Sequence, residues 1–439
     1  MPRVKIRHAL IAVLCVVSLS ANLWLALAHY HGLAAFDFLG KAGRYVAAEP
    51  LALVHHSDLD FVEQTSASYW HGADSSAFTE SPEQQWRALA ASAQYLELRQ
   101  YDGVPLPKRD IPFIFDRPGA PNLAAFAAQE KLDQVIRGSA DEYGAMLKLA
   151  SWVGRIFDHG TDALPAGATP NDVARIVEAG KGGARYWCEI AARVMTHAAA
   201  AVGWPSRLVT ISHDGYEWSH AVTEVWSKQF AKWFLIDTDF NVIYVDNGVP
   251  MSVFEIVARN SSGDLAGIIV QPIAPIKPFF IKRNGMRHLA PAVFRYAHLD
   301  LRNDWINREL PRGSPASGDL ATWRIDNGRL GRLLSAIPQM QDEEVFNWPV
   351  NGVAVLPQRL QRSGDIVNAA VELRTYSPYF SHFVWSRDGV NWNRVVGHAV
   401  DISLGTGVHD LNFSAVTTNG RRGMPTTISL AVRVGLSPK

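Results

Sequence analysis

The 439-residue sequence contains only two cysteines, Cys15 and Cys188. This scarcity excludes a framework of several disulfides and a cysteine-rich structural zinc site. Cys15 lies in an uncharged apolar stretch near the N-terminus, so we do not expect the two thiols to pair. Cys188 is then a single thiol, either a buried inert side chain or a reactive one.

The sequence also lacks an excess of charge of either sign. Its 42 Lys and Arg residues balance 42 Asp and Glu residues, so bulk charge favours neither nucleic acid nor an anionic membrane as a partner, and we expect no nucleic acid. There is no internal repeat, no low-complexity tract and no D-x-D-x-D-G calcium loop. With 48% hydrophobic residues, the chain is expected to fold into two or three domains.

The N-terminus does contain a long apolar run. Three basic residues precede residues 9–28, which carry no charge, and a helix of that length can span a bilayer core. The basic flank predicts a single-pass bacterial inner-membrane protein whose main part lies in the periplasm. The alternative is a cleaved signal peptide, because Ala26–Ala28 fits an A-x-A site, and cleavage after Ala28 would secrete the protein. A buried helix of a cytosolic protein is the least favoured interpretation.

Hydrophobic spacing predicts helices in the first half of the chain and strands after them. Helices are expected over residues 81–101, 122–136, 140–160 and 188–203. Strands are expected over residues 205–213, 220–227, 232–240 and 241–250. Ser252-x-x-Glu255 is a capping box that begins another helix.

The C-terminal part of the chain reads as strands. The runs "DIVNAAVELRTY", "HFVWSRDGVNWNRVV" and "TTISLAVRV" alternate with a period of two, and Asp388-Gly389 predicts a hairpin turn. We therefore predict a β-sandwich over residues 351–439. Residues 281–312, before it, hold seven basic and three acidic side chains. A solvated surface is favoured there over a patch for an anionic polymer.

Cys188 is expected in the first turn of its helix, where unpaired N–H groups and the helix dipole favour a thiolate and can hold an oxyanion. A thiolate nucleophile needs a base, and the base needs a group that orients it. His220 begins one predicted strand and Asp237 lies in the next. If the two strands pair, Asp237 can fix the tautomer of His220, which then faces the sulfur. Taken singly, each of these residues is more often structural.

Five short motifs occur in an order that resembles the transglutaminase-like superfamily. They span about residues 141–250 and are Trp152-Val153, Gly183 with "YWCEIAARV", "GWPSR" at 203–207, "HAVTEVW" at 220–226, and Trp233 with Asp237. The resemblance implies a papain-like α+β fold, in which a cysteine-bearing helix packs on an antiparallel sheet. It makes Cys188 the nucleophile, His220 the base and Asp237 the orienting carboxylate.

Two features depart from the family pattern. Val222 stands where the family often has an aromatic residue, and Asp239 could compete with Asp237 for the orienting role. The expected division of the chain is a membrane anchor or signal segment (1–30), a helical and loop region (31–120), a transglutaminase-like domain (121–275), a linker with the basic stretch (276–350) and the β-sandwich (351–439).

The resemblance implies attack of the Cys188 thiolate on an amide carbonyl to give a thioester, which water or an amine then resolves. We expect an envelope enzyme of the amidase, protease or transglutaminase type acting on a peptide or protein amide, with no cofactor and no metal. Envelope polysaccharide is a second expected partner. The alternatives are a catalytically silent scaffold and a carbohydrate-binding or protein-binding module of the envelope.

Overall fold

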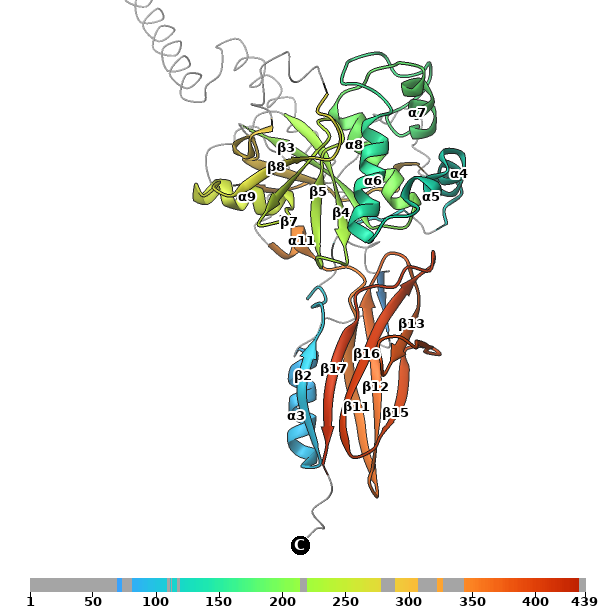
Figure 1. Cartoon of the computed structure of the whole chain (residues 1–439), viewed down its shortest axis with the longest axis vertical. Helices are drawn as coiled ribbons and strands as arrows, with labels where there is room; N and C mark the ends of the chain where they lie inside the picture. Colours follow the sequence, from blue (N-terminus) through green and yellow to red (C-terminus); the bar gives the residue numbers. More distant parts are fainter. Residues whose placement is uncertain are drawn as a thin grey trace, which may run out of the picture.

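The computed structural model describes residues 69–72, 81–108, 111, 113–116, 119–213, 219–277, 289–306, 322–326 and 343–433. The expected anchor or signal segment (1–30) and much of the basic stretch lie outside these residues. Figure 1 shows two bodies, an upper one in which helices cover a sheet and a lower, elongated one made mainly of strands. Within the described part of the chain, no helix has the length and apolar character needed to cross a bilayer.

A five-stranded antiparallel sheet forms the centre of the upper body, in the order β10-β9-β3-β4-β5. Its strands are β3 (Ser206–Ser212), β4 (His220–Ser227), β5 (Lys232–Ile236), β9 (Tyr296–Asp300) and β10 (Thr322–Asp326). Helix α8 (Cys188–Ala201) packs on β3 and β4. Thr223 on β4 donates to the carbonyl of Ala192 at 2.8 Å, which ties the helix to the sheet.

Other helices surround α8, whose Ala-rich sequence allows them to approach closely. They are α4 (Pro121–Glu130), α5 (Leu132–Ile136), α6 (Glu142–Gly154) and α7 (Val173–Lys181). The single helix expected over 122–136 is broken at Lys131, whose φ of 53° is left-handed and ends α4. Helix α7 was not expected from the sequence.

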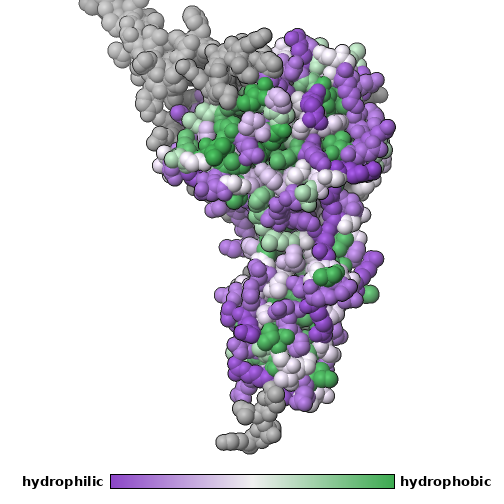
Figure 2. All heavy atoms as spheres, in the orientation of Figure 1, coloured by the Kyte–Doolittle hydropathy of each residue, from purple (hydrophilic) through white to green (hydrophobic). Residues whose placement is uncertain are grey.

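A smaller antiparallel sheet, in the order β7-β6-β8, lies beside the central one. It contains β6 (Val242–Asp246), β7 (Val249–Pro250) and β8 (Ile268–Pro272). Helix α9 (Val253–Ser262) begins with the predicted capping box of Ser252 and Glu255. Figure 2 shows hydrophobic residues on the upper body in the region of β8 and α9. Ile269 on the edge strand β8 is 59% exposed.

The lower body is the β-sandwich. One sheet has the order β14-β13-β16-β17-β2, and the other joins β1, β12 and β11, with β15 also pairing with β12. The first sheet contains β2 (Leu96–Asp102), β13 (Phe380–Ser386), β14 (Asn393–Arg394), β16 (Gly407–Thr417) and β17 (Thr426–Val432). The second contains β1 (Trp70–His71), β11 (Ala354–Ser363), β12 (Ile366–Tyr376) and β15 (Ala399–Leu404). Apolar side chains from both sheets form one core.

The predicted α+β class, with a cysteine helix on an antiparallel sheet and a C-terminal sandwich, is confirmed. The helix expected over 81–101 is wrong in its second half. Helix α3 (Pro82–Ala93) ends at Gln94, which has a left-handed φ of 43°. Strand β2 follows, and its alternate residues Leu96 and Leu98 are buried in the sandwich core. Pairing with β17 therefore stabilises an extended conformation over a continued helix.

The domain boundaries expected from the sequence remain a prediction, but two long-range pairings cross them. β2, from the expected helical and loop region, pairs with β17 of the sandwich. β9 and β10, from the expected linker of 276–350, complete the central sheet beside β3. Short helices η3 (Pro291–Val293), η4 (Asp304–Ile306) and α11 (Glu343–Asn347) occupy the same region. The expected linker thus contributes directly to the upper body.

Candidate active site

Cys188 is the first residue of α8, and the helix has no side-chain cap because Trp187 occupies the N-cap position. The thiol is free and half-buried, and the residue packs against a small apolar cluster of Ala192, Leu208, Ala221 and Trp305. N–H groups in the first turn of an uncapped helix lack intrahelical partners and favour a negative charge beside them. The sulfur therefore lies where both a thiolate and a neighbouring oxyanion are stabilised.

His220 is held against the Asp237 carboxylate by the register of two strands. β4 pairs with β5 with Thr223 opposite Ile236, and one step further along this register places Asp237 opposite Val222. Because alternate residues share a face, His220 lies on the same side. Its Nε2 donates to Oδ2 of Asp237 at 2.7 Å.

Both oxygens of Asp237 are occupied. Oδ1 accepts hydrogen bonds from the backbone N–H groups of Asp239 at 3.0 Å and Phe240 at 2.9 Å. The ring of Phe240 also packs on the imidazole of His220, with centroids 4.6 Å apart. The carboxylate and the imidazole are thus fixed from several sides, which leaves Nδ1 as the nitrogen of His220 not bonded to Asp237.

The pKa of His220 reflects opposing effects. Burial lowers the pKa of the imidazole. The Asp237 carboxylate and Cys188 raise it, each through its charge and a hydrogen bond. The net pKa lies well above the usual 6.5. The protonated imidazole is therefore stabilised by a carboxylate on one side and a sulfur on the other. This is the arrangement expected for a thiolate–imidazolium pair.

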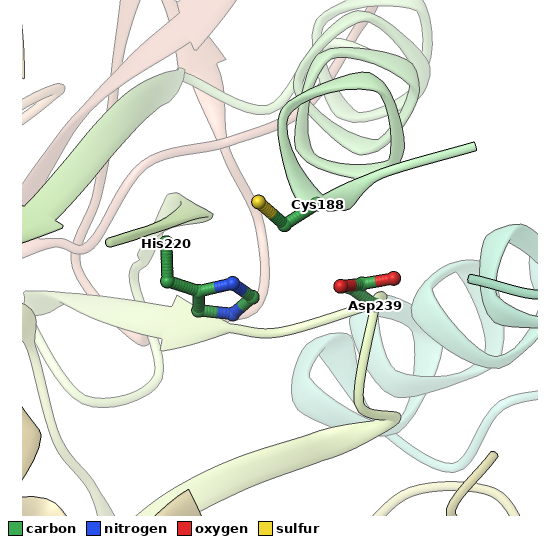
Figure 3. Close-up of side chains that lie close together, drawn as sticks. All are labelled: Cys188, His220 and Asp239. Carbon is green, nitrogen blue, oxygen red and sulfur yellow. The ribbon is translucent and has the colours of Figure 1, made fainter. Parts of the chain in front are cut away.

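A second histidine–carboxylate pair lies on the other side of the thiol. Asp239 is 1% exposed, and its Oδ2 lies 2.9 Å from Nδ1 of His159. A backbone bridge joins His159 to Tyr186, two residues before Cys188. One atom each of Cys188, His220 and Asp239 lie within 4.8 Å of one another, and Figure 3 shows these three side chains around a common centre.

Lys277 supplies a buried positive charge beside the two carboxylates. The residue is 3% exposed, and its Nζ donates to the carbonyl of Phe157 at 2.9 Å. Burial lowers the pKa of Lys277, while Asp239, Asp237 and Asp158 raise it. The ammonium therefore offsets part of the negative charge that the two site carboxylates bring into the interior.

Asp300, at the end of β9, is expected to make the stability of this body depend on pH. Burial raises its pKa to about 7, against the opposing effect of Arg193 and with a smaller contribution from Glu189, both on α8. The folded state keeps this carboxyl protonated after the unfolded chain has ionised, so the stabilisation is present below about pH 4 and is lost as the pH rises to about 7. Asp300→Asn stays neutral and is expected to raise the free energy of unfolding at pH 8 by roughly 1–3 kcal/mol.

Urea unfolding at pH 5 and pH 8 measures this difference, with Asp162→Asn as the control because its side chain is exposed and paired with Arg185. The gain of the Asp300→Asn variant should shrink at pH 5. A loss of stability at pH 8 would show instead that the ionised carboxylate is needed.

The structure brings together Cys188, His220 and Asp237 as the sequence predicted, and their catalytic roles stay a prediction. The expected competition from Asp239 is resolved geometrically, because Asp237 makes the hydrogen bond to His220 and Asp239 pairs with His159. Sequence reasoning missed His159 and Lys277. His159 follows the predicted helix as part of "FDHG", and Lys277 lies in the proline-rich "APIKPFF", where no periodic pattern indicates a role.

Comparisons with known proteins find a similar family for part of the chain. Residues 129–238 match the family model described as the transglutaminase-like superfamily, whereas no curated protein matches the chain. Among solved structures, the chain is similar to red sea bream transglutaminase, at 11% identity and a TM-score of 0.22 over 82% of this chain and 79% of that one. A likeness at that level supports no argument about activity. The family match thus identifies residues 129–238 as the part of the chain that is similar to the transglutaminase-like superfamily.

Proposed function

We propose that the protein is a cysteine-dependent acyl-transfer enzyme that attacks peptide or protein amides. The observation that carries this proposal is the order of three groups: a thiol in the first turn of α8, an imidazole facing it, and the Asp237 carboxylate 2.7 Å behind the imidazole. This order supplies a nucleophile, a base and an orienting group.

The chemistry follows from these positions. The Cys188 thiolate attacks the amide carbonyl, and the backbone N–H groups at the start of α8 stabilise the developing oxyanion. The protonated His220 then gives its proton to the leaving nitrogen, which departs as ammonia or an amine and leaves a thioester on the sulfur. Neutral His220 accepts a proton from the incoming water or amine, whose attack releases the product and restores the thiolate.

The location proposed for this activity is the outer face of a bacterial inner membrane. The apolar run of residues 9–28 behind three basic residues supports export of the chain. Peptide or protein amides of the envelope are then the substrates within reach, and envelope polysaccharide is a second proposed partner. Fractionation of cells expressing the full chain tests the location, and recovery in the cytosol would contradict it.

Intact-mass detection of a thioester tests the reaction. The full-length protein is mixed with glutamine peptides, and the expected result is a mass increase equal to the acyl group on Cys188, which is absent from Cys188→Ala. A folded Cys188→Ala protein with the same mass increase would contradict the assignment of the nucleophile.

Thiol alkylation separates the enzyme from a silent scaffold without a known substrate. Cys188 is expected to react rapidly near neutral pH and to slow by at least about tenfold in His220→Ala, because the imidazolium no longer stabilises the thiolate. His409→Ala serves as the control, since that histidine lies on β16 of the sandwich, where its Nε2 hydrogen-bonds the carbonyl of Gly405 at 2.7 Å. Slow labelling that is insensitive to His220 would favour the scaffold.

A further inference from the structure

Cys188, His220 and Asp239 together offer a sulfur, a nitrogen and an oxygen, and these atoms lie within 4.8 Å of one another (Figure 3). Thiolate, imidazole and carboxylate are the three side-chain ligands that Zn²⁺ uses in proteins. At the usual ligand distances, a tetrahedral Zn²⁺ separates its ligand atoms by roughly 3.3–3.7 Å. The three atoms would therefore have to approach one another by up to roughly 1.5 Å to meet a common ion.

Two of these ligands, His220 and Asp239, already have hydrogen-bond partners that orient them. A zinc-ligating histidine almost always donates its other ring N–H to a carboxylate or carbonyl. His220 does this through Nε2 to Asp237 at 2.7 Å, so that Nδ1 remains for a metal. The Asp239 carboxylate is held by His159, whose Nδ1 lies 2.9 Å from Oδ2. A carboxylate accepts several hydrogen bonds, so Asp239 can keep His159 and still bind an ion.

The charges around the thiol also suit a divalent cation. Asp237 and Asp239 are each 1% exposed, and Lys277 is 3% exposed. With the thiolate, the two carboxylates make three negative groups, against positive charges from Lys277 and the protonated His220. A divalent cation bound to the sulfur, with His220 neutral, would balance them, which lowers the cost of burying these charges together.

We propose that Cys188, His220 and Asp239 bind Zn²⁺ as a three-ligand site with a fourth position open to water. The ion takes the sulfur and Nδ1 of His220, and the single proton that these two atoms share passes to solvent. A sulfur bound to the metal cannot attack a carbonyl, so Zn²⁺ and the amide substrate exclude each other at Cys188. The binding stands on the geometry alone, whereas the exclusion rests on the proposed function.

Cobalt spectroscopy tests the binding. The full-length Cys15→Ser protein, freed of metal by a chelator that is then removed, is titrated with Co²⁺. The expected result is a thiolate-to-cobalt charge-transfer band that saturates at one ion per chain and that Zn²⁺ abolishes. Zn²⁺ is also expected to block alkylation of Cys188, and a chelator should restore it.

Variants identify the ligands. Asp239→Asn is expected to weaken metal binding by at least about tenfold, whereas Cys188→Ser should remove the charge-transfer band. Asp162→Asn, an exposed carboxylate paired with Arg185 in the same body, is the matched control and should bind as the parent does. Circular dichroism confirms that each variant is folded, and His220→Ala provides a second ligand variant should Asp239→Asn be unfolded.

Three outcomes overturn the site: no charge-transfer band, a band that persists in Cys188→Ser, or a band whose affinity is unchanged in both Asp239→Asn and His220→Ala. The last result would place the metal on the thiol alone. Failure of the proposed function is a separate result, because it shows as the absence of a thioester in metal-free protein. Thioester formation at the same rate with saturating Zn²⁺ would overturn the exclusion while leaving the binding intact.

Discussion

Replacing Asp237 with Asn is expected to lower kcat by about 10⁴-fold on any amide that acylates Cys188. The backbone N–H groups of Asp239 and Phe240 both donate to Oδ1, so the single oxygen of an asparagine is held at that position. Its NH₂ group then occupies the position of Oδ2, which lies 2.7 Å from Nε2 of His220. A donor facing Nε2 selects the opposite tautomer, in which Nδ1 carries the proton.

That tautomer cannot take a proton from the thiol or from the incoming acceptor, because its free lone pair points away from the sulfur. The measurement is the single-turnover rate of thioester formation, with ammonia release as the steady-state readout. Asp239→Asn is the matched comparison, since the same substitution there changes the partner of His159 and leaves the Asp237–His220 hydrogen bond in place. A larger loss in Asp239→Asn than in Asp237→Asn would transfer the orienting role to Asp239.

The three predicted site residues could be found from the sequence because each stands at the end of a regular element. Cys188 follows glycines and begins an apolar helical pattern, and His220 begins a strand. Asp237 follows the next strand by one residue. Pairing of the two neighbouring antiparallel strands predicts that His220 and Asp237 meet, and the family resemblance added Cys188 to them.

His159 and Lys277 could not be found in this way. His159 is positioned beside Asp239 through an isolated backbone bridge to Tyr186. Lys277 lies near the carboxylates but comes from a segment without regular spacing. Both depend on where separate parts of the chain pack, which hydrophobic periodicity does not encode.

Long-range strand pairing explains the errors in the fold. Residues 96–102 alone resemble the end of a helix, and only the distant edge of β17 makes them a strand. β9 and β10 similarly complete the central sheet from a region expected to be a linker. Local propensity decides the state of a segment when its partners are near, and distant partners override it here.

Two of the family-like motifs contribute a buried ion pair to the interior, away from the thiol. Arg207 of "GWPSR" and Glu224 of "HAVTEVW" lie opposite each other on β3 and β4, and they are 0% and 1% exposed. Nε of Arg207 donates to Oε2 of Glu224 at 2.7 Å, and the guanidinium lies 4.2 Å from the ring centre of Trp233 and 4.4 Å from that of Trp348.

Glu224 also connects the sheet to α9, because its Oε1 accepts from the backbone N–H of Val253 at 2.7 Å, at the first residue of that helix. Removing its charge leaves a guanidinium buried between two indole rings without a counterion. Glu224→Gln is therefore expected to lower the free energy of unfolding by about 3–5 kcal/mol, the cost of breaking a buried pair from one side.

Urea unfolding followed by tryptophan fluorescence measures this loss. Glu83→Gln is the matched control, since its pair with Arg87 lies on the surface of α3 with side chains 42% and 58% exposed, and it should change stability by less than about 0.5 kcal/mol. The double variant Arg207→Met, Glu224→Gln is expected to regain part of the loss, because no unpaired charge remains in the core. If Glu224→Gln costs no more than Glu83→Gln, the guanidinium is stabilised by the two indole rings and the carbonyl of Phe346 without needing the carboxylate.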